Sequence, residues 1–327
     1  MRVLVCGGAG YIGSNMAAML GRAGLEPVVF DDLSRGHQAA VAGFEFVRGD
    51  IADYDLLVDT LREFKIEAVM HFAALIEVGE SVQEPLKYYK SNLSNTQTLL
   101  SAMEQAGVER FVFSSTAAVY GIPQQVPTTE QAPKQPINPY GQTKLACEKM
   151  CHYQSLTGRL RYASLRYFNA CGAGHGGTLG EDHRPESHLI PLTIQTAMGK
   201  RNAVTVYGTD YPTPDATCIR DYIHVEDLCM AHLLALNKLD SNSELIYNLG
   251  NNAGYSVREV IETVKKVSGR NFRVVEGDRR PGDTAVLTAD ATKAKTELGW
   301  KPAFAGLDEI VETAWKWHTE HPDGYPD

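Results

Sequence analysis

A β-rich run at Val3–Cys6 leads directly into Gly7-Gly8-Ala9-Gly10-Tyr11-Ile12-Gly13, and a helical pattern follows. Gly7 permits a tight turn, Gly10 lets a pyrophosphate approach the backbone, and Gly13 allows helix and strand to pack closely. The helix begins with free N–H groups that point at the phosphates. A strand, this loop and a helix in that order predict a dinucleotide-binding site. Its expected cofactor contacts are Gly7, Gly10, Tyr11, Ile12 and Gly13.

An acidic residue stands at the end of the second β-rich run. Asp31 lies eighteen positions after Gly13, where a carboxylate accepts hydrogen bonds from the adenosine ribose and repels a 2′-phosphate. The sequence therefore favours NAD over NADP, although Arg35 is close enough to weaken this preference. The alternative for Asp31 is a solvated turn. After the third β-rich run, Asp50 and Ile51 are candidates for holding the adenine edge.

The first half of the chain alternates strands with helices. Its β-rich runs are 3–6, 27–30, 44–47, 68–71, 111–114 and 162–167. This alternation predicts an α/β fold with a Rossmann-type, doubly wound parallel sheet. We expect residues 1–171 to form the NAD-binding domain and residues 172–327 to form mainly a second, smaller substrate-binding domain. Two later apolar runs, near 219–225 and 245–249, are expected to rejoin the large sheet.

The composition argues against several classes of protein. The 327 residues carry a net charge of -9, which disfavours nucleic-acid binding because a phosphate-binding face needs a basic patch. The apolar runs are far shorter than the ~20 residues of a membrane span. The chain enters a strand at once, so we expect no signal peptide and a cytoplasmic location. Six scattered cysteines without a C-x-x-C pair fit a reducing compartment.

Three histidines, His175, His183 and His188, lie in or at the end of a Gly-rich segment at 172–188. Their spacing matches no common pattern of zinc ligands. We therefore favour a plain loop and assign no metal ligands here, and a zinc site is the alternative.

The segment Asn138-Pro139-Tyr140-Gly141-Gln142-Thr143-Lys144 carries the clearest catalytic signal. Asn138 is a good N-cap and Pro139 fits the first helical turn. Tyr140 and Lys144 then lie at i and i+4 on one helix face. A free phenol has a pKa of about 10, and a neighbouring ammonium and a positive nicotinamide ring both favour the phenolate. We expect Tyr140 to act as general base and Lys144 to hydrogen-bond the nicotinamide ribose.

These two motifs resemble those of the extended short-chain dehydrogenase/reductase family. The G-x-x-G-x-x-G spacing is typical of it, although Cys6 stands where a Thr often precedes the first glycine. Family members also carry a catalytic Ser or Thr hydroxyl at the position of Thr116. Backbone capping is the alternative role for such hydroxyls and suits Ser114 and Ser115 better. Further cofactor contacts implied by the resemblance are Phe72, Ala73, Asn92, Ser114, Lys144 and Tyr167.

Within that family, essentially the whole chain resembles the UDP-glucose 4-epimerase family. The matching segments are 78–81, 165–169, 210–213, 220–225, 247–250, 279–283 and 324–327. By this resemblance Arg220 and Arg280 bind a diphosphate, a task that suits the planar fork of arginine. An exposed charge or an ion pair with Asp221 or Asp278 is their alternative. The implied substrate contacts are Thr116, Tyr140, Asn169, His188, Leu189, Tyr207, Arg220, Arg280, Asp283 and Leu287.

Some positions depart from the pattern of that family. Ile76 stands where some members have a Lys near the cofactor phosphates, His188 where an Asn often contacts substrate, and Ser94-Asn95 where Asn-Gly is more usual. Leu287 stands where a bulky Tyr restricts related enzymes to unmodified hexoses, so we expect the pocket to admit a 2-acetamido group. The alternative for Leu287 is a core position in a strand.

The resemblance implies reversible 4-epimerisation of a UDP-hexose, between UDP-glucose and UDP-galactose, through a 4-keto sugar with one retained NAD. A dehydratase would need an acidic pair where Ala117 and Ala118 stand. A 4-epimerase for another UDP-sugar (UDP-N-acetylglucosamine, UDP-xylose/arabinose or UDP-glucuronate) stays open, and a non-catalytic NAD-binding regulator is disfavoured. Helices at 96–106 and 139–156 resemble a pair that forms a homodimer interface in related enzymes. The apolar residues expected there are Leu99, Leu100, Met103, Leu145 and Met150.

Overall fold

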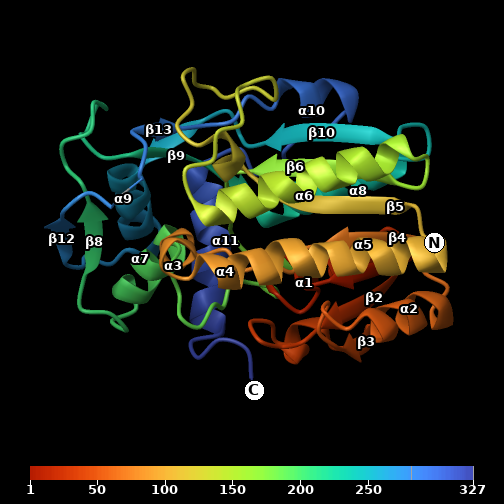
Figure 1. Cartoon of the computed structure of the whole chain (residues 1–327). Coiled ribbons are helices and arrows are strands. Elements are labelled where there is room, and N and C mark those ends of the chain that lie inside the picture. Colours follow the sequence, from red (N-terminus) through yellow and green to blue (C-terminus); the bar gives the residue numbers. More distant parts are fainter. Residues whose placement is uncertain (281, 327) are drawn as a thin grey trace.

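A seven-stranded sheet forms the centre of the computed structural model, which describes residues 1–280 and 282–326 (Figure 1). The strand order is β10-β6-β5-β4-β1-β2-β3, and every neighbouring pair is parallel. These strands are β1 (Arg2–Cys6), β2 (Glu26–Asp31), β3 (Glu45–Arg48), β4 (Ala68–His71), β5 (Arg110–Thr116), β6 (Arg161–Tyr167) and β10 (Glu244–Leu249). The order reverses between β1 and β4, where such sheets bind ligands. The expected Rossmann-type α/β sheet is confirmed.

Helices cover both faces of this sheet. Helices α1 (Tyr11–Arg22) and α8 (Val225–Lys238) cover one face, and α2 (Tyr54–Glu63), α5 (Asn95–Ala106) and α6 (Pro139–Leu156) cover the other. Successive strand residues point to opposite faces, so Val3 and Val5 pack with the first pair of helices, whereas Leu4 and Cys6 pack with the other three. This double burial explains why the parallel strands read as continuous apolar runs.

The remaining strands form two small sheets, and the remaining helices lie partly around these sheets and partly against the large sheet and its covering helices (Figure 1). One sheet joins β7 (Asn169–Cys171), β9 (Ile219–His224), β11 (Gly254–Ser256) and β13 (Val286–Leu287), and the second joins β8 (Val204–Tyr207) to β12 (Val274–Gly277). The helices are α3 (Val78–Gln83), α4 (Pro85–Tyr88), α7 (Leu189–Ala197), α9 (Val257–Ser268), α10 (Thr292–Glu297) and α11 (Leu307–Glu320). Helices α7, α9 and α11 share an apolar core of their own. The division at residues 1–171 and 172–327 stays a prediction.

Of the two later strands, one rejoins the large sheet and the other does not. Strand β10 pairs in parallel with β6, as the apolar run near 245–249 predicts. Strand β9 pairs with β7, β11 and β13, so the same expectation for 219–225 is wrong. The buried carboxylate of Asp221 in β9 accepts hydrogen bonds from the N–H groups of Asn251 (2.8 Å) and Ala289 (3.1 Å), which hold β9 in the smaller sheet. An apolar run indicates a strand but not its partner.

Two helical segments have distinctive local features. The side chain of Asn138 caps α6 by accepting a hydrogen bond from the Gly141 N–H (2.8 Å), and Pro139 is the first helical residue. Helix α4 continues without a break through a π-helical turn, Tyr89–Ser94, into α5. A π turn accommodates one more residue than an α turn. Asn92, one of the predicted site residues, lies in this turn.

Within the described residues, no helix combines the length and the apolar character that a membrane span requires. All six cysteines are buried and none is in a disulfide.

Candidate active site

The glycine loop after β1 packs closely against neighbouring backbone. Gly7 has a φ of 72°, and a Cβ added to it would lie 2.5 Å from the Ala73 nitrogen. A Cβ on Gly13 would lie 2.1 Å from the Gly7 oxygen, whereas one on Gly10 would meet nothing nearer than 3.4 Å. Gly7 and Gly13 are therefore needed for close packing, whereas Gly10 is less crowded. No side chain caps the start of α1, so its first N–H groups are available to phosphates.

Asp31, at the end of β2, braces this loop. Its carboxylate accepts hydrogen bonds from the N–H of Ala9 (2.9 Å) and of Leu33 (2.8 Å). Burial raises the pKa of Asp31, and these two N–H groups act against that rise. The expected contact with a ribose stays a prediction, since each carboxylate oxygen accepts more than one hydrogen bond. Sequence reasoning missed the bracing role, because it depends on how β2 lies beside the loop.

The candidate adenine contacts lie after β3. Asp50 accepts a hydrogen bond from the Ala52 N–H (2.8 Å) in a turn, and Ile51 is buried beside it. Both stay predictions.

Asn92 connects the loop after β4 to α6. The N–H groups of Phe72 and Ala73 donate to the Cys6 oxygen (2.8 and 3.2 Å), which keeps this loop beside the glycine turn. The side-chain oxygen of Asn92 accepts from the Leu75 N–H (2.8 Å), and its NH₂ donates to the Leu75 oxygen (2.9 Å) and the Thr143 hydroxyl (3.4 Å). Asn92 thus orders the loop, and its contact with a cofactor stays a prediction.

Thr116, Tyr140 and Lys144, the catalytic trio, come from the end of β5 and the first turns of α6. Thr116 ends β5, and its hydroxyl accepts from the Ala118 N–H (3.1 Å) and hydrogen-bonds Tyr140. Lys144 is buried, donates from Nζ to the Ser114 oxygen (2.8 Å) and lies 4.9 Å from the centre of the Phe113 ring. The structure thus brings the three predicted groups to one place.

The electrostatics of this trio differ from the sequence-based expectation. Burial raises the pKa of Tyr140, the Thr116 hydroxyl lowers it and the Glu77 carboxylate raises it. The predicted shift toward phenolate is therefore absent in the chain by itself. The reason is that the Lys144 ammonium is directed at a backbone oxygen, and its own burial lowers the pKa of Lys144 from 10.5 to about 8.

A buried ion pair that sequence reasoning missed lies beneath the trio. Arg166 of β6 donates to Glu148 of α6 through Nε (2.8 Å) and Nη2 (2.6 Å), and the Ser115 hydroxyl donates to the same carboxylate (2.5 Å). Both charged side chains are almost fully buried. The available signals were an arginine inside an apolar strand and a glutamate four residues after Lys144. The predicted contact residues Ser114 and Tyr167 also meet here, hydroxyl to hydroxyl.

Five predicted substrate residues lie close together on β8, β9, β13 and the segment before β13. Arg220 pairs with Asp283 (3.3 Å), and Arg280 pairs with the same carboxylate (2.9 Å). The Arg280 guanidinium also lies 5.4 Å from the ring of Tyr207. Leu287 is half-buried and lies opposite Arg220 in the β13–β9 register. The two arginines do form ion pairs, but with Asp283 rather than with Asp221 or Asp278.

The remaining predicted substrate residues lie at β7 and at the start of α7. Asn169 donates to the Asp221 oxygen (2.8 Å). His188 precedes Leu189, the first residue of α7, and its N–H donates to the Glu186 carboxylate (2.8 Å). The Nδ1 of His188 contacts the Glu181 carboxylate, so Nε2 is the ring atom left for a substrate. The expected plain loop at 172–188 therefore contains a cluster of charged groups.

The comparisons with known proteins agree with this geometry. Residues 3–250 match the NAD-dependent epimerase/dehydratase family, and the chain belongs to that family. It is 52% identical over 328 residues to the UDP-glucose 4-epimerase of Streptomyces lividans, and the aligned region covers 100% of this chain and 98% of the relative. A crystal structure of a UDP-glucose 4-epimerase superposes with a TM-score of 0.97 at 47% identity, covering 100% of both chains. The Bifidobacterium longum UDP-glucose 4-epimerase in complex with NAD+ and UDP gives 0.95 at 38% identity, covering 99% of this chain and 100% of that one.

Replacing Lys144 by methionine is expected to raise the free energy of unfolding by about 1–3 kcal/mol near neutral pH, because a desolvated ammonium is removed. Its folded-state pKa, about 8, lies below the ordinary 10.5, so the wild type gains stability as pH rises between these values. The difference between variant and wild type should therefore shrink over that window. Urea unfolding at several pH values measures both effects.

The matched control is Lys149→Met, which changes an exposed lysine on the same helix. We expect it to change the free energy of unfolding by no more than ~0.5 kcal/mol. A Lys144→Met variant that is less stable than the wild type near neutral pH would contradict the view that burial of the Lys144 ammonium costs stability.

Proposed function

We propose that the chain interconverts UDP-glucose and UDP-galactose by reversible 4-epimerisation with tightly bound NAD. The observation that carries this proposal is the convergence of Thr116, Tyr140 and Lys144 at the carboxyl edge of the sheet, the same edge from which the glycine loop leaves β1. A dinucleotide on that loop places its reactive end near the trio. The family and the named relatives support the choice of reaction.

The residues of the glycine loop fit NAD, because Gly10 is not crowded and the start of α1 is uncapped. When bound there, NAD would supply hydride transfer at sugar C4 and the positive charge of its oxidised ring. The proposed cofactor contacts are Gly7, Gly10, Tyr11, Ile12, Gly13, Asp31, Asp50, Ile51, Phe72, Ala73, Asn92, Ser114, Lys144 and Tyr167.

In the proposed mechanism, Tyr140 takes the proton from the sugar 4-hydroxyl and later gives one back. The Thr116 hydroxyl, which already hydrogen-bonds Tyr140, holds the sugar oxygen in line with the phenol. Lys144 fixes the cofactor ribose from its buried position on the same helix face. The resulting 4-keto sugar turns over within the pocket before reduction on the opposite face, so no net oxidation occurs.

The nucleotide half of the substrate is held away from the reacting carbon, which leaves the sugar free to turn. We assign the diphosphate to Arg220 and Arg280 and a uridine ribose hydroxyl to Asp283. A diphosphate is a stronger partner for the two guanidinium groups than the single carboxylate they share now. The other proposed contacts are Asn169, His188, Leu189, Tyr207 and Leu287. Ala117 and Ala118 offer no acid for the elimination that a dehydratase needs.

Tyr140→Phe should lower turnover of UDP-glucose at least ~100-fold, because the general base is lost, while NAD content stays unchanged. A coupled assay of UDP-galactose formation and release of NAD on denaturation measure both. Tyr54→Phe, which changes an exposed tyrosine on α2, is the control and should behave as wild type. Near-normal activity of Tyr140→Phe would refute the mechanism, and an inactive wild type would refute the function.

Leu287 is proposed to set the size of the sugar pocket, so the wild type should convert UDP-N-acetylglucosamine as well as UDP-glucose. Leu287→Tyr should then lower kcat/KM for the acetamido sugar by at least ~10-fold relative to UDP-glucose, since a size filter discriminates by about 1–3 kcal/mol. Leu287→Met, similar in volume, is the control. Equal losses on both substrates, or no acetamido conversion by the wild type, would remove Leu287 from this role.

We also propose a cytoplasmic homodimer that uses α5 and α6. The prediction of the apolar interface residues is largely wrong. Four of the five expected residues are buried within the chain itself: Leu99, Leu100, Met103 and Leu145. Tyr153 and Leu156 on α6 are exposed at 68% and 69% and are better candidates. Light scattering should give twice the mass of the chain at micromolar concentration, and Leu156→Glu should shift it toward monomer. A monomeric wild type would contradict the proposal.

A further inference from the structure

Four side chains with metal-ligand chemistry meet outside the catalytic trio. Glu181, His183, Glu186 and His188 each direct one ligand atom into a space where all four atoms lie within 4.8 Å of one another. The Nδ1 of His183 is 3.2 Å from Glu181 Oε1 and 3.6 Å from Glu186 Oε1. The Nδ1 of His188 is 3.8 Å from Glu186 Oε1 and in short contact with Glu181 Oε1.

Two of these separations are close to those of a tetrahedral metal site. Zinc bonds to imidazole nitrogen and carboxylate oxygen are ~2.0–2.2 Å long, so ligand atoms around one tetrahedral ion are about 3.4 Å apart. The contacts of His183 with Glu181 and Glu186 lie near this value. Both carboxylates are almost fully buried, at 4% and 3% exposure. Such groups are held in an interior only when their charge is balanced.

Hydrogen bonding within the protein leaves one of these groups without a proper partner. The Nδ1 atom of His183 is buried and, although near two carboxylates, makes no hydrogen bond of acceptable geometry. Simple pairing of a protonated histidine with a glutamate would satisfy this nitrogen. A cation placed between the four groups would satisfy it together with the other three ligand atoms.

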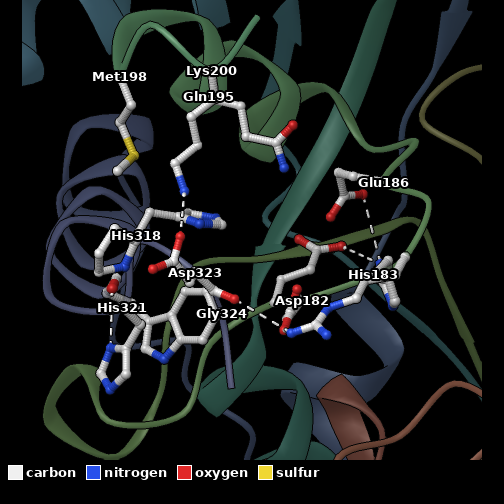
Figure 2. A pocket seen from close by; sticks show the side chains of 14 residues that line it. Asp182, His183, Glu186, Gln195, Met198, Lys200, His318, His321, Asp323 and Gly324 are labelled. Carbon is white, nitrogen blue, oxygen red and sulfur yellow. Dashed lines mark hydrogen bonds and ion pairs between the residues drawn. The ribbon is translucent and has the colours of Figure 1, made fainter. Parts of the chain in front are cut away.

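A cavity adjoins three of the four cluster residues. It has a volume of about 310 Å³ and is lined on one side by Glu181, His183 and Glu186. Figure 2 shows His183 and Glu186 pointing toward one another at its wall, with His318 and Lys200 at some distance from them. The ligand atoms themselves are largely buried, so the cavity borders the cluster and does not contain it.

We propose that Glu181, His183, Glu186 and His188 bind one divalent cation of the zinc class, through the two Nδ1 atoms and one oxygen of each carboxylate. Two carboxylates balance the charge of the ion, and mixed imidazole and carboxylate ligands suit zinc. Four protein ligands leave no open position, so the site is structural and takes no part in the reaction. The ligand pattern is Glu-x-His-x-x-Glu-x-His at 181–188.

The bound ion would fix the loop that leads into α7 against the catalytic side of the molecule. Ser187, between two of the ligands, donates its hydroxyl to Glu77 (2.8 Å), the carboxylate whose charge acts on Tyr140. The last ligand directly precedes Leu189, the first residue of α7. Loss of the ion is therefore expected to loosen the loop and the start of α7 without displacing the cofactor loop.

The test uses the untagged full chain, treated with EDTA, desalted and then titrated with ZnCl₂. We expect one zinc per chain by elemental analysis, and a melting temperature several degrees higher with zinc than without it. Cobalt(II) in place of zinc should give the intense visible absorption of a four-coordinate ion. His183→Asn and Glu186→Gln, close in volume to the native side chains, should lose both the stoichiometric zinc and the thermal shift.

His175→Asn is the matched control, since His175 lies in the same loop outside the cluster, and it should bind zinc as the wild type does. Circular dichroism establishes that each variant is folded, and two separate variants guard against the failure of one. Less than one-tenth of a zinc per chain in the wild type at micromolar free zinc, or equal zinc binding by the folded His183→Asn and Glu186→Gln variants, would overturn the proposal.

Discussion

The catalytic trio depends on the buried ion pair between Glu148 and Arg166. This pair joins α6 to β6, and Ser115 joins it to the end of β5. Two such charges remain in an apolar interior only when hydrogen bonds satisfy both, and removal of one partner is typically more damaging than replacement of both. Because Thr116 follows Ser115 and the other two members of the trio lie earlier on the Glu148 helix, this pair sets the spacing of hydroxyl, phenol and ammonium.

The catalytic trio is in position, but its protonation states in the chain alone do not suit general base catalysis. Burial favours the neutral form of Tyr140 and also of Lys144, so the chain alone has no strong base at this place. A positive ring beside the phenol would reverse the balance for Tyr140. The proposed reaction therefore couples the basicity of the site to the oxidation state of its cofactor, since the ring is positive only before hydride transfer. The protein thus positions the reacting groups, and the bound cofactor would supply the positive charge.

Features set by nearby residues or by the order of elements were predictable from the sequence, whereas individual contacts between distant segments were not. The glycine loop and the Tyr140–Lys144 pair follow from spacing within a few residues, the parallel sheet follows from the alternation of strands and helices, and the structure reproduces all three. The sheet to which β9 belongs and the bracing role of Asp31 depend on packing between segments far apart in the chain. The cluster at 181–188 is local but irregular, and no helical or strand period reveals that its side chains converge.

The π-helical turn at Tyr89–Ser94 has an evolutionary consequence. A π turn is in effect a one-residue insertion in a helix, and in this turn the backbone oxygen of Asn92 accepts hydrogen bonds from the side chains of Thr96 and Cys147. Loss of that residue would rotate α4 relative to α5 by about 100°, which would move every side chain upstream to a different face. Substitutions within this turn should therefore be tolerated far better than a deletion. A homologue that lacks one residue here would need a different arrangement of the residues around Asn92.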